Sequence, residues 1–135
     1  MMAKYTFKVY PKGMGREVWR VIEFAGDWSL DILCMDILHA FDFDSDHLYE
    51  FNMDNKLYGS RFSYRYNPYD GGPSTAVPVN ELGLCKGQNF LLHYDFGDDW
   101  AFVIHVNKIE VVEGNVDGRV IRSKGTIQQY PDYDW

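Results

Sequence analysis

The sequence predicts an α+β fold, in which a mostly antiparallel β-sheet packs against one principal α-helix. Aromatic residues make up 17% of the 135 residues, and such side chains favour the half-buried surface of a sheet. Several short segments alternate apolar and polar residues with the period of a strand, whereas one segment has the period of a helix. A hairpin is expected to come first and the helix second, an order compatible with a β-grasp.

Length and composition indicate one domain over residues 1–135, because 46% of the residues are hydrophobic and the length is that of one domain. We expect an ordered core over residues 4–124 and an aromatic tail, 125–135, that either docks through its rings or frays. No apolar run is long enough to span a bilayer, and the first residues lack the apolar segment of a secretory signal. We therefore expect a cytoplasmic protein with no membrane partner.

The first element is expected to be an antiparallel hairpin. Residues 5–9 alternate with Tyr5, Phe7 and Val9 on one face, which is typical of a strand. Residues 11–15 hold a proline and two glycines and indicate a turn, after which residues 17–24 are rich in β-branched and aromatic side chains.

The helix is expected next, from the cap Ser29 to about Phe41. A serine hydroxyl accepts a hydrogen bond from an amide of the first turn, and Asp31 complements the helix dipole. The apolar side chains that share one helical face are Leu30, Leu33, Cys34, Ile37, Leu38 and Phe41. Cys34 is therefore expected to be a buried, reduced thiol in the face that covers the sheet.

The remaining strands are shorter or less regular. We expect a third strand at 47–52, short strand segments at 56–58 and 62–66, a loop at 67–78, one helical turn at 79–82, and a hairpin through Asp117-Gly118 that joins 108–113 to 119–123. Two further strands carry apolar sets at even positions, namely Phe90, Leu92, Tyr94 and Phe96, then Trp100, Phe102, Ile104 and Val106. A connecting loop of odd length puts both sets on the same side of the sheet.

Two clusters carry residue types that perform chemistry. His93, Asp95 and His105 fall on the odd face, where they could ligate a metal or relay protons, but a polar outer sheet face is the simpler interpretation. We therefore predict no metal and no cofactor. Asp95, Asp98 and Asp99 crowd one tight turn, which suits either acid–base work or the capping of backbone amides.

Arginines interleaved with aromatic rings form a third cluster, which contains Arg16, Arg20, Arg61 and Arg65. This pattern is typical of proteins that grip single strands and also of arginines that stack within an acidic protein. Lys and Arg number 13 and Asp and Glu 20, so the net charge is -7. That charge argues against a whole-surface nucleic-acid binder, which must neutralise phosphates, and we expect no nucleic-acid partner.

Three stretches together resemble the Ri-plasmid (pRiA4b) ORF-3-like family, also labelled the insertion-element passenger TnpR family. They are Val18-Trp19-Arg20-Val21, His47-Leu48-Tyr49-Glu50-Phe51 and Tyr94-Asp95-Phe96-Gly97-Asp98-Asp99-Trp100. The resemblance implies the fold described above and no established activity. The site residues that match the family motifs are Trp19, Arg20, His47, Glu50, Asp95, Asp98 and Trp100. We expect Arg20 to pair with an acid of the DFGD turn, which would make either a structural clasp or a polar ligand pocket.

The function expected from these observations is a non-enzymatic binding or protein-interaction module with a protein or small-molecule ligand. The chain has no P-loop, GxGxxG, GxSxG or HExxH motif, which argues against an enzyme. One alternative is a small metal-dependent or acid–base hydrolase that uses His47, His93, His105 and the acids of the DFGD turn. The other, implied by the TnpR label, is a nucleic-acid accessory factor of a mobile element.

Overall fold

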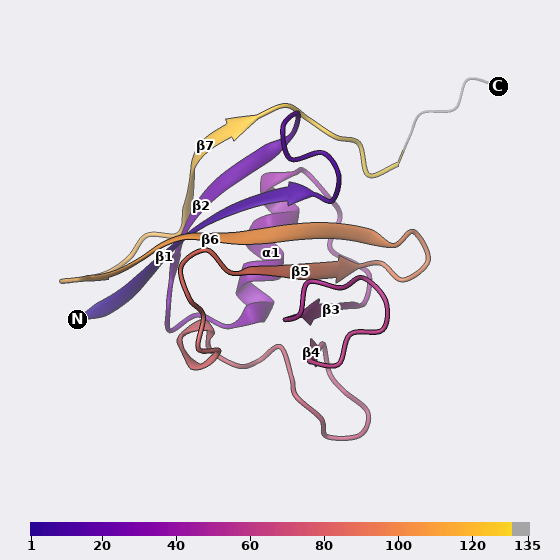
Figure 1. The fold of residues 1–135 in the computed structure, drawn as a ribbon, viewed down its shortest axis with the longest axis horizontal. Helices are drawn as coiled ribbons and strands as arrows, with labels where there is room; N and C mark the ends of the chain where they lie inside the picture. The colour runs from indigo at the N-terminus through magenta and orange to yellow at the C-terminus, as the bar shows by residue number, and fades with distance from the viewer. Residues whose placement is uncertain (131–135) are drawn as a thin grey trace.

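A single antiparallel sheet dominates the computed structural model, which describes residues 1–130 (Figure 1). The elements in chain order are β1 (Met2–Pro11), β2 (Trp19–Ala25), α1 (Leu30–Ala40), β3 (Tyr49–Asn52), β4 (Ser63–Arg65), the 3-10 turn η1 (Val79–Glu81), β5 (Asn89–Tyr94), β6 (Trp100–Val112) and β7 (Arg119–Lys124). The seven strands lie in the order β4-β3-β5-β6-β1-β2-β7, and all six pairings are antiparallel.

The α+β class expected from the sequence is wrong, because the fold is nearly all-β, although a hairpin does come first and the helix second. Helix α1 has 11 residues, whereas seven strands build one continuous sheet within residues 1–130. The helical period of residues 30–41 correctly predicts α1, but this helix occupies only a short part of the chain. The chain after residue 41 adds five strands and one 3-10 turn to the described part of the fold.

Helix α1 forms where the sequence predicts it. The Ser29 hydroxyl accepts a hydrogen bond from the amide of Ile32 at 3.3 Å, and Phe41 follows the last helical residue. The apolar face is buried, with Leu33 and Ile37 fully inaccessible. Figure 1 shows the helix lying behind the sheet, so that one face of the sheet is turned away from α1 and toward the viewer. We call these the inner face, against α1, and the outer face.

The loop between β5 and β6 leaves most of the even-numbered apolar residues of both strands on the same face of the sheet. Tyr94 pairs directly with Trp100, so the even-numbered residues of both strands point to the inner face, as expected from a loop of odd length. Phe96 is the exception: it is 45% exposed and its ring packs against His93, an outer-face residue. The backbone of Asp95 has φ of 62°, which ends the strand alternation one residue before Phe96. The expectation that Phe96 and Trp100 share a face is therefore wrong.

Strand β7 does not pair with β6, so the predicted Asp117-Gly118 hairpin is also wrong. β7 pairs with β2 at the edge of the sheet, between Trp19↔Lys124 and Glu23↔Arg119. The β6 residues nearest this turn, from Lys108 to Val112, pair with β1 on one side, whereas β5 pairs with β6 only between Trp100 and His105. The chain after β6 therefore crosses two strands before it pairs, and Val116 is buried in that connection.

The other short elements follow the sequence in part. β4 confirms the expected 62–66 segment and η1 the helical turn at 79–82, whereas Lys56–Tyr58 is a loop and not a strand. Docking of the tail is seen up to Tyr130: Gln129 is buried and its side chain bonds to the backbone of Asp44. Residues 131–135 lie outside the described part of the chain.

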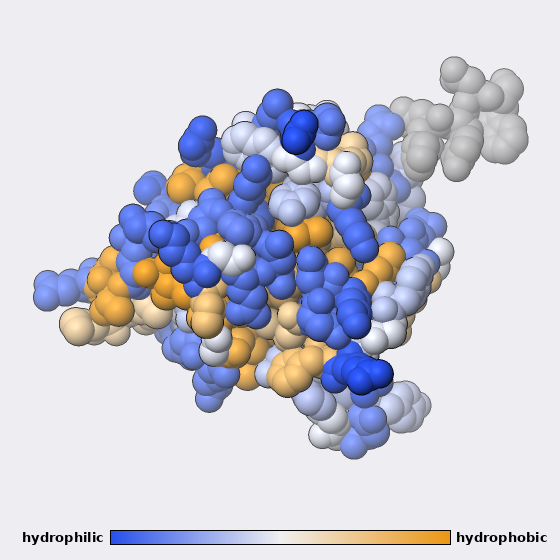
Figure 2. Space-filling model, viewed as in Figure 1, coloured by the Kyte–Doolittle hydropathy of each residue, from blue (hydrophilic) through white to orange (hydrophobic). Residues whose placement is uncertain are grey.

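Figure 2 shows hydrophilic residues over much of the outer face. Among residues 1–130 there is no helix with the length and apolar character needed to cross a membrane.

Candidate functional site

A buried histidine on the outer face is the centre of a polar cluster. His93 of β5 is 6% exposed, and its Nε2 lies 2.7 Å from Oδ1 of Asp99. Its Nδ1 lies 3.5 Å from a carboxylate oxygen of Glu50 and makes no hydrogen bond within residues 1–130. Buried polar atoms are nearly always hydrogen-bonded, so an imidazole held between two carboxylates with one nitrogen unbonded is a candidate functional group.

Asp99 holds this cluster in place from the turn between β5 and β6. Its backbone φ is 52°, and its second carboxylate oxygen accepts a hydrogen bond of 2.5 Å from the hydroxyl of Tyr58. The hydrogen bonds from Tyr58 and then from His93 lower the pKa of Asp99, and the bond to Asp99 raises the pKa of Tyr58. The loop that carries Tyr58 is thereby tied to the β5–β6 turn, while the ring of Phe96 covers His93.

Glu50 connects the histidine to solvent. Direct pairing across β4, β3, β5 and β6 puts Arg65, Glu50, His93 and Ala101 in one row on the outer face. Glu50 is partly exposed and lines an open pocket of about 470 Å³ beside β3 and β4. The residues that line this pocket, which we call the Glu50 pocket, are Glu50, Gly59, Ser60, Arg61, Phe62, Ser63, Arg65 and Pro73.

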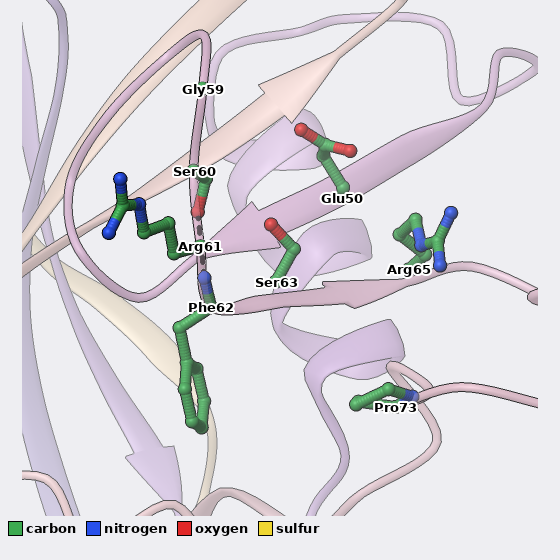
Figure 3. Close-up of a pocket in the computed structure, with 8 residues that line it drawn as sticks. All are labelled: Glu50, Gly59, Ser60, Arg61, Phe62, Ser63, Arg65 and Pro73. Atoms are coloured by element: carbon green, nitrogen blue, oxygen red, sulfur yellow. Dashed lines mark hydrogen bonds between the residues drawn. The ribbon is translucent and has the colours of Figure 1, made fainter.

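Two arginines flank the carboxylate in this pocket. Figure 3 shows Glu50 and Ser63 pointing into the same space, with Arg61 on one side and Arg65 on the other. Arg65 lies 3.2 Å from Asp70, whereas Arg61 has no carboxylate partner within residues 1–130. A site with two guanidinium groups and one carboxylate can bind an anionic group and, beside it, a hydrogen-bond donor.

The loop that supplies Arg61 is shaped by Asp54. The Asp54 carboxylate accepts hydrogen bonds from the Ser60 hydroxyl at 2.6 Å and from the Arg61 amide at 3.0 Å. These two bonds lower the pKa of Asp54. One wall of the pocket is thus fixed by the Asp54 side chain, which bonds one side-chain hydroxyl and one backbone amide of its own loop.

A family model described as plasmid pRiA4b ORF-3-like protein matches residues 3–131, nearly the whole chain. The chain belongs to this family. Among solved structures, a protein of unknown function, MM3350, from Methanosarcina mazei Go1 superimposes with a TM-score of 0.79. It is 23% identical, and the match covers 96% of this chain and 74% of that one, so the likeness shows the fold alone. No curated protein matches the sequence.

The motif residues of the pRiA4b ORF-3-like family do not form one site. His47 and Asp95 do come together, with Nε2 of His47 3.5 Å from Oδ2 of Asp95 and 3.1 Å from the hydroxyl of Tyr130. Asp95 is buried and accepts hydrogen bonds from the amides of Gly97 and Asp98, so its carboxylate caps its own turn. Asp98 is exposed and contributes its amide to that cap.

The expected pairing of Arg20 with an acid of the DFGD turn is wrong. Arg20 is 9% exposed on the inner face, and its guanidinium donates to the carbonyls of Ala40, Trp19 and Lys124 at 2.9, 2.9 and 3.0 Å. It also lies 4.8 Å from the ring centre of Phe41. Arg20 therefore caps the carboxyl end of α1, where a cation is favoured by the helix dipole, and takes no part in a clasp at the turn.

The two tryptophans of the family motifs lie on opposite faces of the sheet. Trp100 packs edge-on against Phe43 at the inner face, whereas Trp19 contacts Lys8 and Arg122, two charged residues outside the core. Of the seven predicted site residues, Glu50 is the one that lies in the Glu50 pocket.

The weak metal candidates, His93 and His105, have different partners. His105 bonds to Asn89 at 2.7 Å, four rungs from the cluster of His93 along β5 and β6. Within residues 1–130, no three His, Cys, Asp or Glu side chains are arranged to hold a metal ion. The free cysteines do not add to a site, since Cys34 is buried and Cys85 is exposed.

Sequence reasoning did not place Tyr58 in the polar cluster and did not distinguish Asp99 from the other acids of its turn. Asp99 stood in the DFGDD turn beside Asp98, but which of the two acids faces His93 depends on the left-handed backbone at Asp99. Tyr58 lies 41 residues from Asp99 and no local pattern connects them.

Proposed function

We propose that this protein is a non-enzymatic binding module whose Glu50 pocket takes a small polar molecule with an anionic group and a neighbouring hydrogen-bond donor. The observation that carries this proposal is the placement of Arg61 and Arg65 on either side of Glu50 around an open pocket (Figure 3). The guanidinium groups suit a carboxylate or phosphate of the ligand, and the Glu50 carboxylate suits an ammonium or hydroxyl group.

The position of the Glu50 carboxylate is fixed by the strands and side chains around it, which supports its role in binding. Glu50 is held on a strand between two paired strands, and His93 behind it is fixed by Asp99. A group on a paired strand is positioned more precisely than a group on a loop, so Glu50 can select the ligand's orientation.

Titration with 4-aminobutyrate, which carries one carboxylate and one ammonium group, tests the proposal. In amide-detected NMR spectra we expect shifts at Glu50 and along residues 59–65. Replacement of either arginine, as Arg61→Gln or Arg65→Gln, should weaken binding about tenfold, since a charge-assisted hydrogen bond contributes roughly 1.5–3 kcal/mol. Arg122→Gln, which removes the same group from the opposite edge of the sheet, is the matched control. Equal titration curves for all four proteins would refute the proposal.

A small acid–base hydrolase is the second candidate, favoured by the buried Nδ1 of His93 that faces Glu50 without a hydrogen bond. In such an enzyme Glu50 would accept a proton from water in the pocket, with His93 as its positioning residue. The rate of hydrolysis of 4-nitrophenyl acetate and of bis(4-nitrophenyl) phosphate by the protein and by Glu50→Gln tests this function. Equal rates for the two proteins would count against it.

A further inference from the structure

Cations without a carboxylate partner gather at the end of the sheet opposite the Glu50 pocket. The ion pairs of residues 1–130 engage Lys4, Arg65, Lys108 and Arg119 among the lysines and arginines. Five of the cations left without such a pair belong to β1, β7 and the β1–β2 turn: Lys8, Lys12, Arg16, Arg122 and Lys124. Glu17 lies among them, and Lys12 lines a separate pocket together with Asp98 and Asp99.

These cations surround the aromatic rings of Trp19 and Tyr10. The ammonium of Lys8 lies 5.3 Å from the ring centre of Trp19, and the guanidinium of Arg122 lies 5.9 Å from it. Lys124 pairs with Trp19 across β2 and β7, and its ammonium donates to the carbonyl of Arg16 at 2.8 Å. The three strands thus hold the cations and the indole together on a common surface.

The same surface is hollowed next to the rings. An open pocket of about 380 Å³ is lined by Lys8, Tyr10, Gly13, Gly15, Arg16 and Glu17. Glycine at position 15 allows this shape, because a side chain there would meet the ring of Tyr10 at 3.0 Å. We call the surface formed by Lys8, Tyr10, Arg16, Trp19, Arg122 and Lys124 the cationic surface.

A cationic surface is unexpected in a chain with a net charge of -7. Like charges that gather without counter-charges repel one another, and the described structure offers them little compensation beyond ring faces and carbonyls. The surface is therefore electrostatically complementary to an anionic partner, whereas the rest of the protein repels one. Such a partner must be small or flexible enough to contact this end of the sheet alone.

We propose that the cationic surface binds single-stranded nucleic acid. The lysines and arginines neutralise phosphates, and the rings of Trp19 and Tyr10 offer planar surfaces for bases, which is the combination by which sheet faces bind single strands without reading sequence. An acidic peptide would satisfy the cations but leaves the two rings without a role. The net charge that argues against a whole-surface binder does not exclude a local surface of this kind.

Fluorescence anisotropy with a labelled twelve-residue oligothymidylate tests the proposal. The four cations of the surface can contact four phosphates. The logarithm of the binding constant should therefore fall with a slope of about -2.8 against the logarithm of salt concentration. Affinity should then drop about fifty-fold between 50 and 200 mM salt. Arg122→Gln should make the slope shallower by about 0.7, and Trp19→Leu should weaken binding about tenfold by removing one stacking surface.

Arg61→Gln is the matched control and should bind the oligonucleotide as the unmodified protein does. A twelve-residue oligoglutamate is the competing probe. Absence of oligothymidylate binding at 20 mM salt, equal affinity for oligoglutamate, or an unchanged salt slope in Arg122→Gln would each overturn the proposal. Arg122 is exposed on an edge strand, so its replacement tests the surface even where Trp19→Leu fails to fold. Failure of ligand binding at the Glu50 pocket would leave this result unaffected.

Discussion

Replacement of Arg20 by methionine tests whether this buried cation caps helix α1. Methionine is an unbranched side chain that can still pack beside Phe41, but it removes the guanidinium above that ring and all three hydrogen bonds to the carbonyls of Ala40, Trp19 and Lys124. Each net hydrogen bond contributes about 1 kcal/mol, and a carbonyl left without a donor adds to the loss. We expect unfolding in urea to require about 3 kcal/mol less free energy, which for a domain of this size lowers Tm by about 10 °C.

The pH dependence separates a helix cap from a carboxylate clasp. Carbonyl oxygens do not titrate, so the cost of Arg20→Met should be the same at pH 7 and pH 4. If Arg20 instead drew its stability from an aspartate of the DFGD turn, the cost would shrink as that carboxyl became protonated. Arg122→Met, on exposed β7, is the control and should change stability by less than about 0.5 kcal/mol. A cost for Arg20→Met below about 1 kcal/mol, or one that vanishes at pH 4, would refute the role of Arg20 as a cap.

Three further predictions concern the turn, the thiols and the core. The pKa of Asp99 is lowered in the folded protein, so the interactions of this carboxylate stabilise the fold above the pKa of an unfolded aspartate, and their contribution is lost as pH falls through the pKa of the folded state. In Tyr58→Phe the carboxyl NMR resonance of Asp99 should titrate at a higher pH. An unchanged titration would contradict the hydrogen bond between Tyr58 and Asp99. Burial raises the pKa of the Cys34 thiol, so a disulfide reagent should modify Cys85 alone in the native protein and both cysteines in urea, which mass spectrometry would show. Leu33→Ala removes a fully buried side chain from α1 and should cost about 3 kcal/mol in urea unfolding; a loss under 1 kcal/mol would mean that α1 is not packed on the sheet.

Local patterns predicted the elements whose partners are close in sequence. The β1–β2 hairpin and α1 follow from alternation, a turn cluster and a serine cap, all within residues 2–41. The position of β7 could not be predicted in this way, because its pairing with β2 spans about 100 residues and depends on β1 already occupying the edge of β6. The fold class failed for the same reason, since the number of strands that join one sheet is decided by long-range pairing.

The site was less predictable than the fold because backbone conformation decides which face each side chain takes. Asp95 and Asp99 both adopt left-handed φ, so the five-residue turn does not continue the alternation of β5. Phe96 is thereby carried to the outer face and covers His93, while Trp100 returns to the inner face. Aspartate tolerates positive φ better than most residues, but a run of acids does not reveal which of them adopts it.

The two proposed binding surfaces can be tested independently because two strands of the sheet separate them. The Glu50 pocket belongs to β3, β4 and their loop, and the cationic surface to β1, β2 and β7, with β5 and β6 between them in the sheet. Substitution of an exposed arginine at one edge leaves the hydrogen bonds of the other edge in place, and effects at well-separated positions add. Arg61→Gln and Arg122→Gln therefore form a reciprocal pair: each should abolish or weaken one interaction and preserve the other. If either substitution weakened both interactions, the two surfaces would be parts of one site, and the separation argued from the sheet order would be wrong.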